Sequence, residues 1–184
     1  MTDNDLISKV GKAIELLHTH DYWLLKNDLS EQSISHKLAE HLQRLIPDYH
    51  VDCEYDGDID NINWKQKIAF LKGRLETKLL SENKVHLLDH EPIERAVFPD
   101  IIIHHRGTNT GNVCIIEIKK STNKTSFDYD RIKLESYTSA INGKNLGYQL
   151  GIFINFQTGQ DGLNETVIYF KNGAEYPLPQ KLDI

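Results

Sequence analysis

Hydrophobic residues recur at helical spacing in two stretches of the first 50 residues. Over residues 4–18 the apolar positions lie three or four apart, which predicts an amphipathic helix. A second helix is expected over about 30–46, because Ser30 can cap its start and Pro47 stands just beyond its end. Residues 50–56 then alternate apolar with polar side chains, which is the period of a half-buried strand.

The middle of the chain predicts an inserted helix and a hairpin. Apolar residues over 64–80 again have helical spacing, and a polar connector is expected from there to about residue 96. Two short apolar runs follow, at 97–104 and 113–118, and the segment between them has two glycines, two threonines and an asparagine. Such a segment is typical of a tight turn, so the two runs are expected to pair as a β-hairpin.

The last third of the chain predicts one more helix and two more strands. The helix is expected over about 126–141, where an Asn-Gly pair marks its stop. A buried strand over 148–156 and a final edge strand over 167–170 follow. Apart from the insertion, the order from residue 30 onward is helix, three strands, helix and strand, which predicts an α/β fold.

The composition is that of one ordinary domain. The chain has 184 residues, of which 39% are hydrophobic and 26% charged, and this is enough apolar material for a packed core. No apolar run approaches the roughly 20 residues that span a bilayer, and the acidic start of the chain lacks the features of a secretory signal. Cys53 and Cys114 have no second ligand at metal spacing and are expected to be reduced. These features predict a cytoplasmic protein with no membrane partner.

The charges are unevenly distributed along the chain. The formal net charge is −6, which by itself argues against a nucleic-acid partner. Residues 1–62 carry 5 Lys and Arg against 13 Asp and Glu, whereas residues 63–144 carry 14 against 10. The basic middle of this acidic chain is compatible with a surface for a polyanion. Its basic residues over 64–80 either contact a nucleic-acid backbone or form an ordinary solvated helix face.

Three residues of the predicted hairpin suggest a chemistry. Asp100 follows Pro99 at the start of one strand, and Glu117 and Lys119 stand on the next. Side chains alternate across a strand, so Glu117 and Lys119 point to one face, and the hairpin should bring Asp100 beside them. Two carboxylates suit Mg²⁺ or Mn²⁺, which prefer oxygen ligands. The lysine could orient or deprotonate a water, or stabilise negative charge on a phosphate.

The segments Val97-Phe98-Pro99-Asp100 and Ile116-Glu117-Ile118-Lys119 resemble the signature of the PD-(D/E)XK nuclease superfamily, which has the restriction-endonuclease-like fold. The resemblance covers about residues 30–156. It implies that the whole chain, 1–184, is a single nuclease-like domain whose αβββαβ core has a mixed central sheet flanked by helices. The remaining parts would be an N-terminal helical extension, a helical insertion, and a C-terminal edge strand and tail, at residues 1–29, about 60–94 and 157–184.

The same resemblance implies a hydrolase that cleaves phosphodiester bonds with Mg²⁺ or Mn²⁺. Asp100 and Glu117 would ligate the metal, the backbone carbonyl of Ile118 would be a third ligand, and Lys119 would position or activate the attacking water. DNA is the expected substrate, and small chains of this fold typically act in bacterial or phage defence, restriction or repair. A homodimer, or a partner protein that supplies target recognition, fits the same picture.

The superfamily often adds an acidic residue from the first core helix, and Glu31 and Glu40 are the two candidates. At about 100° per residue, with Ile34 at zero, Glu31 falls at roughly 60°, within the apolar stripe, and Glu40 at roughly 240°, on the opposite side. Glu31 is therefore expected to bind the metal, directly or through water, and to support catalysis. An equally weighted interpretation makes Glu31 a first-turn acid that the helix dipole favours.

Other charged positions have structural interpretations beside the functional ones. Asp130 lies on the inward face of the second core helix, where an ion pair is the favoured interpretation. Its candidate partners are Lys119, Lys120 and Lys133. His104 and His105 end a strand, and they either contact a phosphate or lie exposed to solvent. The acidic residues of 56–60 lack the glycine and glutamate of an EF-hand loop and indicate a solvated turn.

Two rival interpretations stay open beside the nuclease. In one, the chain is a catalytically inactive nuclease-fold module for binding or regulation, which its acidic net charge and the lack of a separate DNA-reading domain favour. A decayed site usually loses its lysine or a carboxylate, whereas all three motif residues are present here. In the other, the chain is a structural α/β domain with an accidental motif. That interpretation leaves unexplained why Glu117 and Lys119 interrupt an apolar run.

Overall fold

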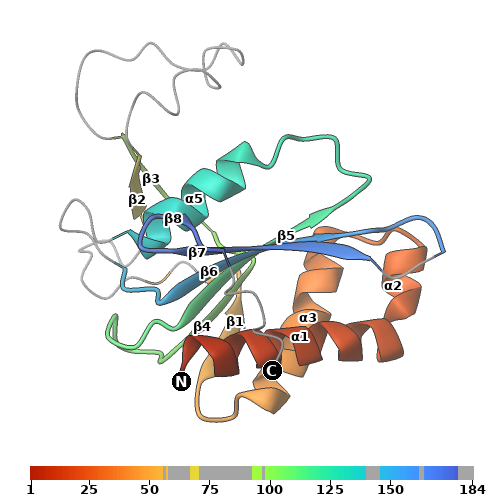
Figure 1. Ribbon diagram of the computed structural model, residues 1–184, viewed down its shortest axis with the longest axis horizontal. Helices are drawn as coiled ribbons and strands as arrows, with labels where there is room; N and C mark the ends of the chain where they lie inside the picture. The colour runs from red at the N-terminus through yellow and green to blue at the C-terminus, as the bar shows by residue number, and fades with distance from the viewer. Residues whose placement is uncertain are drawn as a thin grey trace, which may run out of the picture.

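The fold is built on a mixed six-stranded sheet with the strand order β1-β4-β5-β6-β7-β8 (Figure 1). The computed structural model describes residues 1–55, 57, 67–70, 93–96, 98–139, 146–161 and 164–177. The strands of the sheet are β1 (His50–Cys53), β4 (Ile101–His104), β5 (Cys114–Lys120), β6 (Leu150–Phe156), β7 (Glu165–Lys171) and β8 (Ala174–Glu175). Neighbours run antiparallel except β5 and β6, which are parallel. The expected mixed α/β architecture is therefore confirmed.

Helices cover both faces of this sheet. They are α1 (Asp3–His20), α2 (Tyr22–Lys26), α3 (Glu31–Leu45) and α5 (Asp128–Thr138). Helices α1 and α3 lie below the sheet in Figure 1 and α5 lies above it. Parallel strands need a crossover connection, and α5 lies on the segment that joins β5 to β6. None of the helices in the described ranges is long and apolar enough to cross a membrane.

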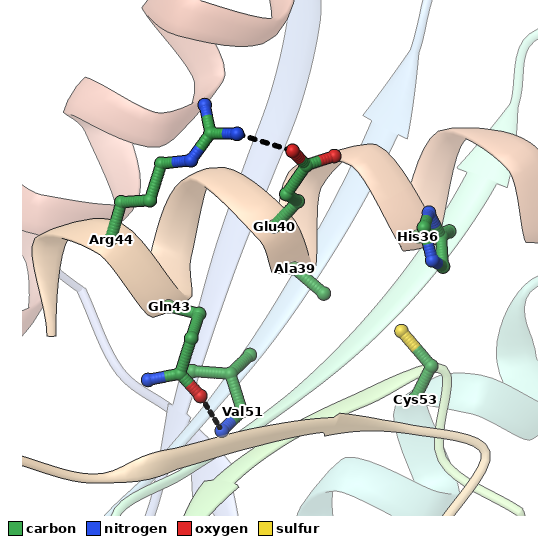
Figure 2. A pocket seen from close by; sticks show the side chains of 7 residues that line it. All are labelled: His36, Ala39, Glu40, Gln43, Arg44, Val51 and Cys53. Atoms are coloured by element: carbon green, nitrogen blue, oxygen red, sulfur yellow. Dashed lines mark hydrogen bonds and ion pairs between the residues drawn. The ribbon is translucent and has the colours of Figure 1, made fainter. Parts of the chain in front are cut away.

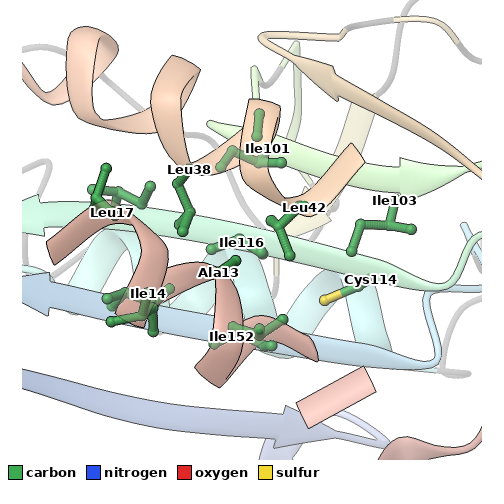
Figure 3. Packing of buried hydrophobic residues seen from close by; sticks show 14 of the residues in the cluster. Ala13, Ile14, Leu17, Leu38, Leu42, Ile101, Ile103, Cys114, Ile116 and Ile152 are labelled. Atoms are coloured by element: carbon green, nitrogen blue, oxygen red, sulfur yellow. The ribbon is translucent and has the colours of Figure 1, made fainter. Parts of the chain in front are cut away.

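The two faces of β5 carry different side chains. Ile116 and Ile118 belong to the core beneath α1 and α3, where they pack with residues such as Leu38 and Leu42 (Figure 3). Ile115 belongs to the smaller core beneath α5. Because side chains alternate along a strand, Glu117 lies on the α5 face, between two buried isoleucines of the opposite face. The sheet therefore presents an ionisable residue in the middle of its most buried strand.

The hairpin of β4 and β5 forms as the sequence predicts, with Ile101 opposite Ile116. Glycine is needed in the turn, because Gly107 and Gly111 both have positive φ, of 82° and 91°. The first strand starts later than residue 97, at Ile101, and Pro99 stands outside it. A proline has no N–H to donate to a strand ladder, which explains the shorter strand.

The expected helix over 64–80 is wrong where the structure describes it. Residues Lys67–Phe70 form strand β2, which pairs antiparallel with β3 (Ile93–Ala96) in a separate two-stranded sheet. The polar connector expected up to residue 96 is wrong at β3 for the same reason. Four residues, Lys67–Phe70, are too few to distinguish a helical from a strand period, and pairing with a strand more than 20 residues away makes this segment a strand. The rest of the expected insertion lies outside the described residues.

Two smaller differences concern the edges of the fold. The strand expected over 167–170 is longer, at Glu165–Lys171, and it is not an edge strand, because it pairs with β6 on one side and with β8 on the other. The short helix α2 was not predicted. Five residues are too few to show a helical period.

Candidate active site

The three motif residues meet at one end of the hairpin. Ile101 pairs with Ile116, so the continued register places Asp100 opposite Glu117. The Asp100 carboxylate accepts a hydrogen bond from the Ile118 N–H, at 2.6 Å between Oδ2 and N. Lys119 follows Glu117 by two residues on the same face of β5. The structure therefore brings Asp100, Glu117 and Lys119 together as the sequence predicts.

Glu117 is a buried carboxylate with one free oxygen. Its side chain is only 2% exposed. Oε2 accepts from the Lys133 ammonium at 2.6 Å, and Oε1 has no hydrogen-bond partner. Burial raises the pKa of Glu117 to about 8, and the nearby carboxylates of Asp100 and Asp130 push it the same way against the effect of Lys133. Burial likewise raises the pKa of Asp100. An unpaired buried oxygen is unusual in a folded protein and calls for a partner.

Lys119 lies between two carboxylates from two helices. Its Nζ is 3.2 Å from Asp130 Oδ2 on α5 and 3.8 Å from Glu31 Oε2 on α3. Burial alone would lower the pKa of Lys119, but these carboxylates outweigh it and raise the pKa. The side chain is still 19% exposed. Lys119 is therefore a positioned, protonated cation that solvent can reach.

Lys133 on α5 is a further charged residue beside Glu117, and sequence reasoning did not place it at the site. Its Nζ contacts Glu117 and, at 3.1 Å, Asp130 Oδ1. The ion pairs expected for Asp130 are thus confirmed for Lys119 and Lys133, whereas Lys120 pairs with Asp28 instead, at 3.0 Å. The spacing from Asp130 to Lys133 puts both on one helix face, and that signal could have linked Lys133 to the hairpin.

Glu31 and Glu40 lie where the helical wheel separates them. Ser30 caps α3 by accepting from the Ser33 N–H, and the first residue of the helix, Glu31, faces the end of β5. Its Oε1 accepts from the Lys120 N–H at 3.1 Å and from the Asn123 side chain at 2.9 Å. Glu31 therefore meets the cluster through Lys119. Glu40 instead forms ion pairs with Lys37 and Arg44 of its own helix.

Asp100 is reached from a groove between α3 and β1. One cavity of about 470 Å³ is lined by residues such as Glu40, Arg44 and Val51 (Figure 2). A second, of about 180 Å³, shares His36 and Cys53 with the first and extends to Asp100. A separate polar cavity of about 350 Å³ borders Glu31. Asp100 and Glu31 thus line different cavities.

The donors at this end of the sheet suit a hard divalent cation. Asp100 and Glu117 supply carboxylate oxygens, and one oxygen of Glu117 is unpaired. Since the N–H and C=O of one strand residue point the same way, the Ile118 carbonyl lies on the strand edge that Asp100 contacts. Within the described ranges no set of three or more His, Cys, Asp or Glu side chains is arranged as a metal site. A metal here would therefore need the backbone carbonyl or water to complete its oxygen ligands.

The remaining candidates fall outside the cluster. His104 is buried and does not lie exposed to solvent. Its Nε2 lies 2.8 Å from Asp52 Oδ2, so a carboxylate already occupies the position expected for a phosphate. His105 stacks on Tyr49, with ring centroids 4.6 Å apart. Cys53 and Cys114 are free thiols, as expected. Of the acidic turn at 56–60, only residue 57 is described, and the side chains of the basic residues over 64–80 lie outside the described part.

Comparisons with protein-family models, with curated proteins and with solved structures find no match for this chain.

Proposed function

We propose that the protein is a divalent-metal-dependent nuclease of the PD-(D/E)XK type that hydrolyses phosphodiester bonds, with DNA as its substrate. The observation that carries this proposal is the meeting of Asp100, Glu117 and Lys119 on one face at the end of a β-hairpin. Apart from β2 and β3, which form a separate sheet, the order along the chain is α3, β1, β4, β5, α5 and β6, and this order supports the proposal because the motif implies the same core.

Each residue of the cluster has a distinct role in this proposal. Asp100, Glu117 and the Ile118 carbonyl would hold Mg²⁺ or Mn²⁺, which supplies a Lewis acid for the phosphate and an activated water. Lys119 is held protonated by Asp130 and Glu31. A protonated lysine suits orienting the water and stabilising charge on the phosphate, rather than removing a proton. Glu31 would position Lys119, and it would bind the metal directly or through water, as the motif implies.

Exposed aromatic side chains beside the cluster support a nucleic-acid substrate. Phe98 is 53% exposed and stands two residues before Asp100. Phe127 is 40% exposed and lies 5.2 Å, centroid to centroid, from Phe153, which is the register partner of Glu117. Nucleobases stack on exposed aromatic rings next to a phosphate-binding site. The two rings are therefore proposed to hold bases on either side of the bond that is cleaved.

A second candidate function is a catalytically inactive module that binds or regulates. The observation that favours it is the pairing of both lysines of the cluster with carboxylates, most closely Lys133 with Glu117 at 2.6 Å. In this interpretation the charges lock α5 onto the sheet, and the surface around Phe98 and Phe127 binds without cleavage.

One assay separates the two candidates. The protein is incubated with plasmid, single-stranded DNA and RNA, with Mg²⁺, with Mn²⁺ and with EDTA. The nuclease proposal expects cleavage of DNA with a metal and none in EDTA. Cleavage of RNA alone would change the substrate but keep the reaction. Binding to these nucleic acids without cleavage under any metal would overturn the nuclease and favour the inactive module.

A further inference from the structure

Lys133 is a buried lysine at the place where a metal would bind. Its side chain is 9% exposed, and lysines are almost never buried unless they are paired. Its ammonium lies 2.6 Å from Glu117 Oε2 and 3.1 Å from Asp130 Oδ1. The Tyr129 ring lies 5.5 Å from the same atom. The lysine thus neutralises the carboxylate that the proposed function assigns to the metal.

A divalent cation and this ammonium cannot share Glu117 without strong repulsion. Two positive charges about 4 Å apart repel strongly where water is largely excluded. A metal on Glu117 and Asp100 would therefore drive the ammonium away from Glu117. Lysine has a flexible four-carbon stem, and Asp130 and the Tyr129 ring remain beside it as partners.

We propose that Lys133 is an internal counter-cation, which holds Glu117 in the metal-free protein and which a divalent metal displaces. This inference rests on the proposed function, because it assumes that the metal binds at Glu117. Lys133 is a positioning residue in this scheme and not a catalytic one. It holds the buried Glu117 side chain in the metal-free protein and weakens metal binding by repelling a cation from the same carboxyl group.

Two measurements on the intact chain test this competition. In the first, Mn²⁺ affinity is compared by calorimetry in Lys133→Gln, which removes the charge, and in Lys133→Arg, which keeps it. Lys133→Gln should bind Mn²⁺ more tightly by about tenfold or more, one logarithmic step in Kd, and Lys133→Arg should not. Arg131→Gln is the matched control, because Arg131 lies on the same helix and pairs with Glu175 far from the metal position.

The second measurement uses the wild type and needs no variant to fold. Lysine acetylation is followed by mass spectrometry with and without saturating Mn²⁺. Lys133 should react faster with the metal present, while the exposed Lys37 on α3 should not change. If Mn²⁺ binds but neither Lys133 reactivity nor the affinity of Lys133→Gln changes, this inference is overturned and the nuclease proposal stands. If the wild type and Lys133→Gln both fail to bind Mn²⁺, the metal site and the inference fall together.

Discussion

The sheet carries two clusters of charged side chains on its α5 face, at opposite ends of β4. At one end, Asp52 of β1 forms contacts with His104 and Arg106. At the other, Asp100 lies beside Glu117. Each end has a carboxylate on the sheet, but only at the Asp52 end do both oxygens have hydrogen-bond partners. Asp52 Oδ2 accepts hydrogen bonds from His104 Nε2 and Arg106 Nε, both at 2.8 Å, and Oδ1 accepts one from Arg106 Nη2. At the other end, Glu117 Oε1 has no partner.

The pKa values of the two carboxylates move in opposite directions as a result. The hydrogen bonds from Arg106, with His104, lower the pKa of Asp52 against the effect of burial. Burial raises the pKa of Glu117 to about 8, because one ammonium does not compensate for the loss of water. A buried polar group with all its hydrogen bonds stabilises a fold, whereas a buried polar group that lacks a hydrogen bond costs free energy and needs an explanation. The Asp52 carboxylate is therefore fully paired, whereas Glu117 keeps one buried oxygen without a partner.

The largest effect that distinguishes the two ends is expected on the cleavage rate. Removing the cation nearest the phosphate, in Lys119→Ala, should lower the rate by about 10²–10³, the usual loss for one preorganised electrostatic contact. Removing the cation of the other cluster, in Arg106→Ala, should leave the rate unchanged. Nucleic-acid affinity in Ca²⁺ should change only modestly in both. Equal losses in the two variants would mean that the effect comes from general charge or stability.

The next effect concerns metal binding, measured by Mn²⁺ calorimetry. Loss of a residue that hydrogen-bonds to a metal ligand typically weakens metal binding by about 10–100-fold. Asp100→Asn removes a ligand itself, so it should weaken Mn²⁺ binding at least as much. Asp52→Asn at the other end should bind Mn²⁺ like the wild type. Binding that persists in Asp100→Asn would place the metal elsewhere.

The geometry of the Glu117 end was predictable because its sequence signals are local. Pro99 before Asp100, the alternation along Ile116, Glu117 and Ile118, and the glycines of the turn all lie within about 20 residues of one another. These features determine both the strand pairing and the face on which each side chain lies. The helical period, which is also a local signal, predicts that Glu31 and Glu40 lie on different faces of α3.

What could not be predicted depends on distant partners. The pairing of β2 with β3 joins segments more than 20 residues apart, and no local period favours it over a helix. His104 is buried because Asp52, on a strand far away in the sequence, comes to lie beside it. Lys133 meets Glu117 only when α5 packs on the sheet. Tertiary packing decides each of these contacts.

The third effect is on stability and should appear only at the Asp52 end. Asp52→Asn should lower the free energy of unfolding by about 1–3 kcal/mol at neutral pH, because it weakens the bonds to His104 and Arg106. The pKa of Asp52 is lower in the folded protein than its ordinary value of 3.8. Its contribution is therefore present above about pH 4 and is lost as the pH falls through the folded pKa. Denaturant unfolding at pH 7 and pH 3 should show the gap between variant and wild type closing at the lower pH.

The smallest effects compare Glu31 with Glu40, which share helix α3 but lie on different faces. Glu31→Gln should reduce cleavage, because it removes the charge that helps to position the Lys119 ammonium 3.8 Å from Glu31 Oε2. The fold should stay intact. Glu40→Ala removes two solvent-side ion pairs and should change the free energy of unfolding by no more than about 0.5 kcal/mol. Cleavage assays and thermal unfolding of both variants measure these outcomes side by side. Equal activity in the two would leave Glu31 as a first-turn acid whose only role is to stabilise the start of its helix.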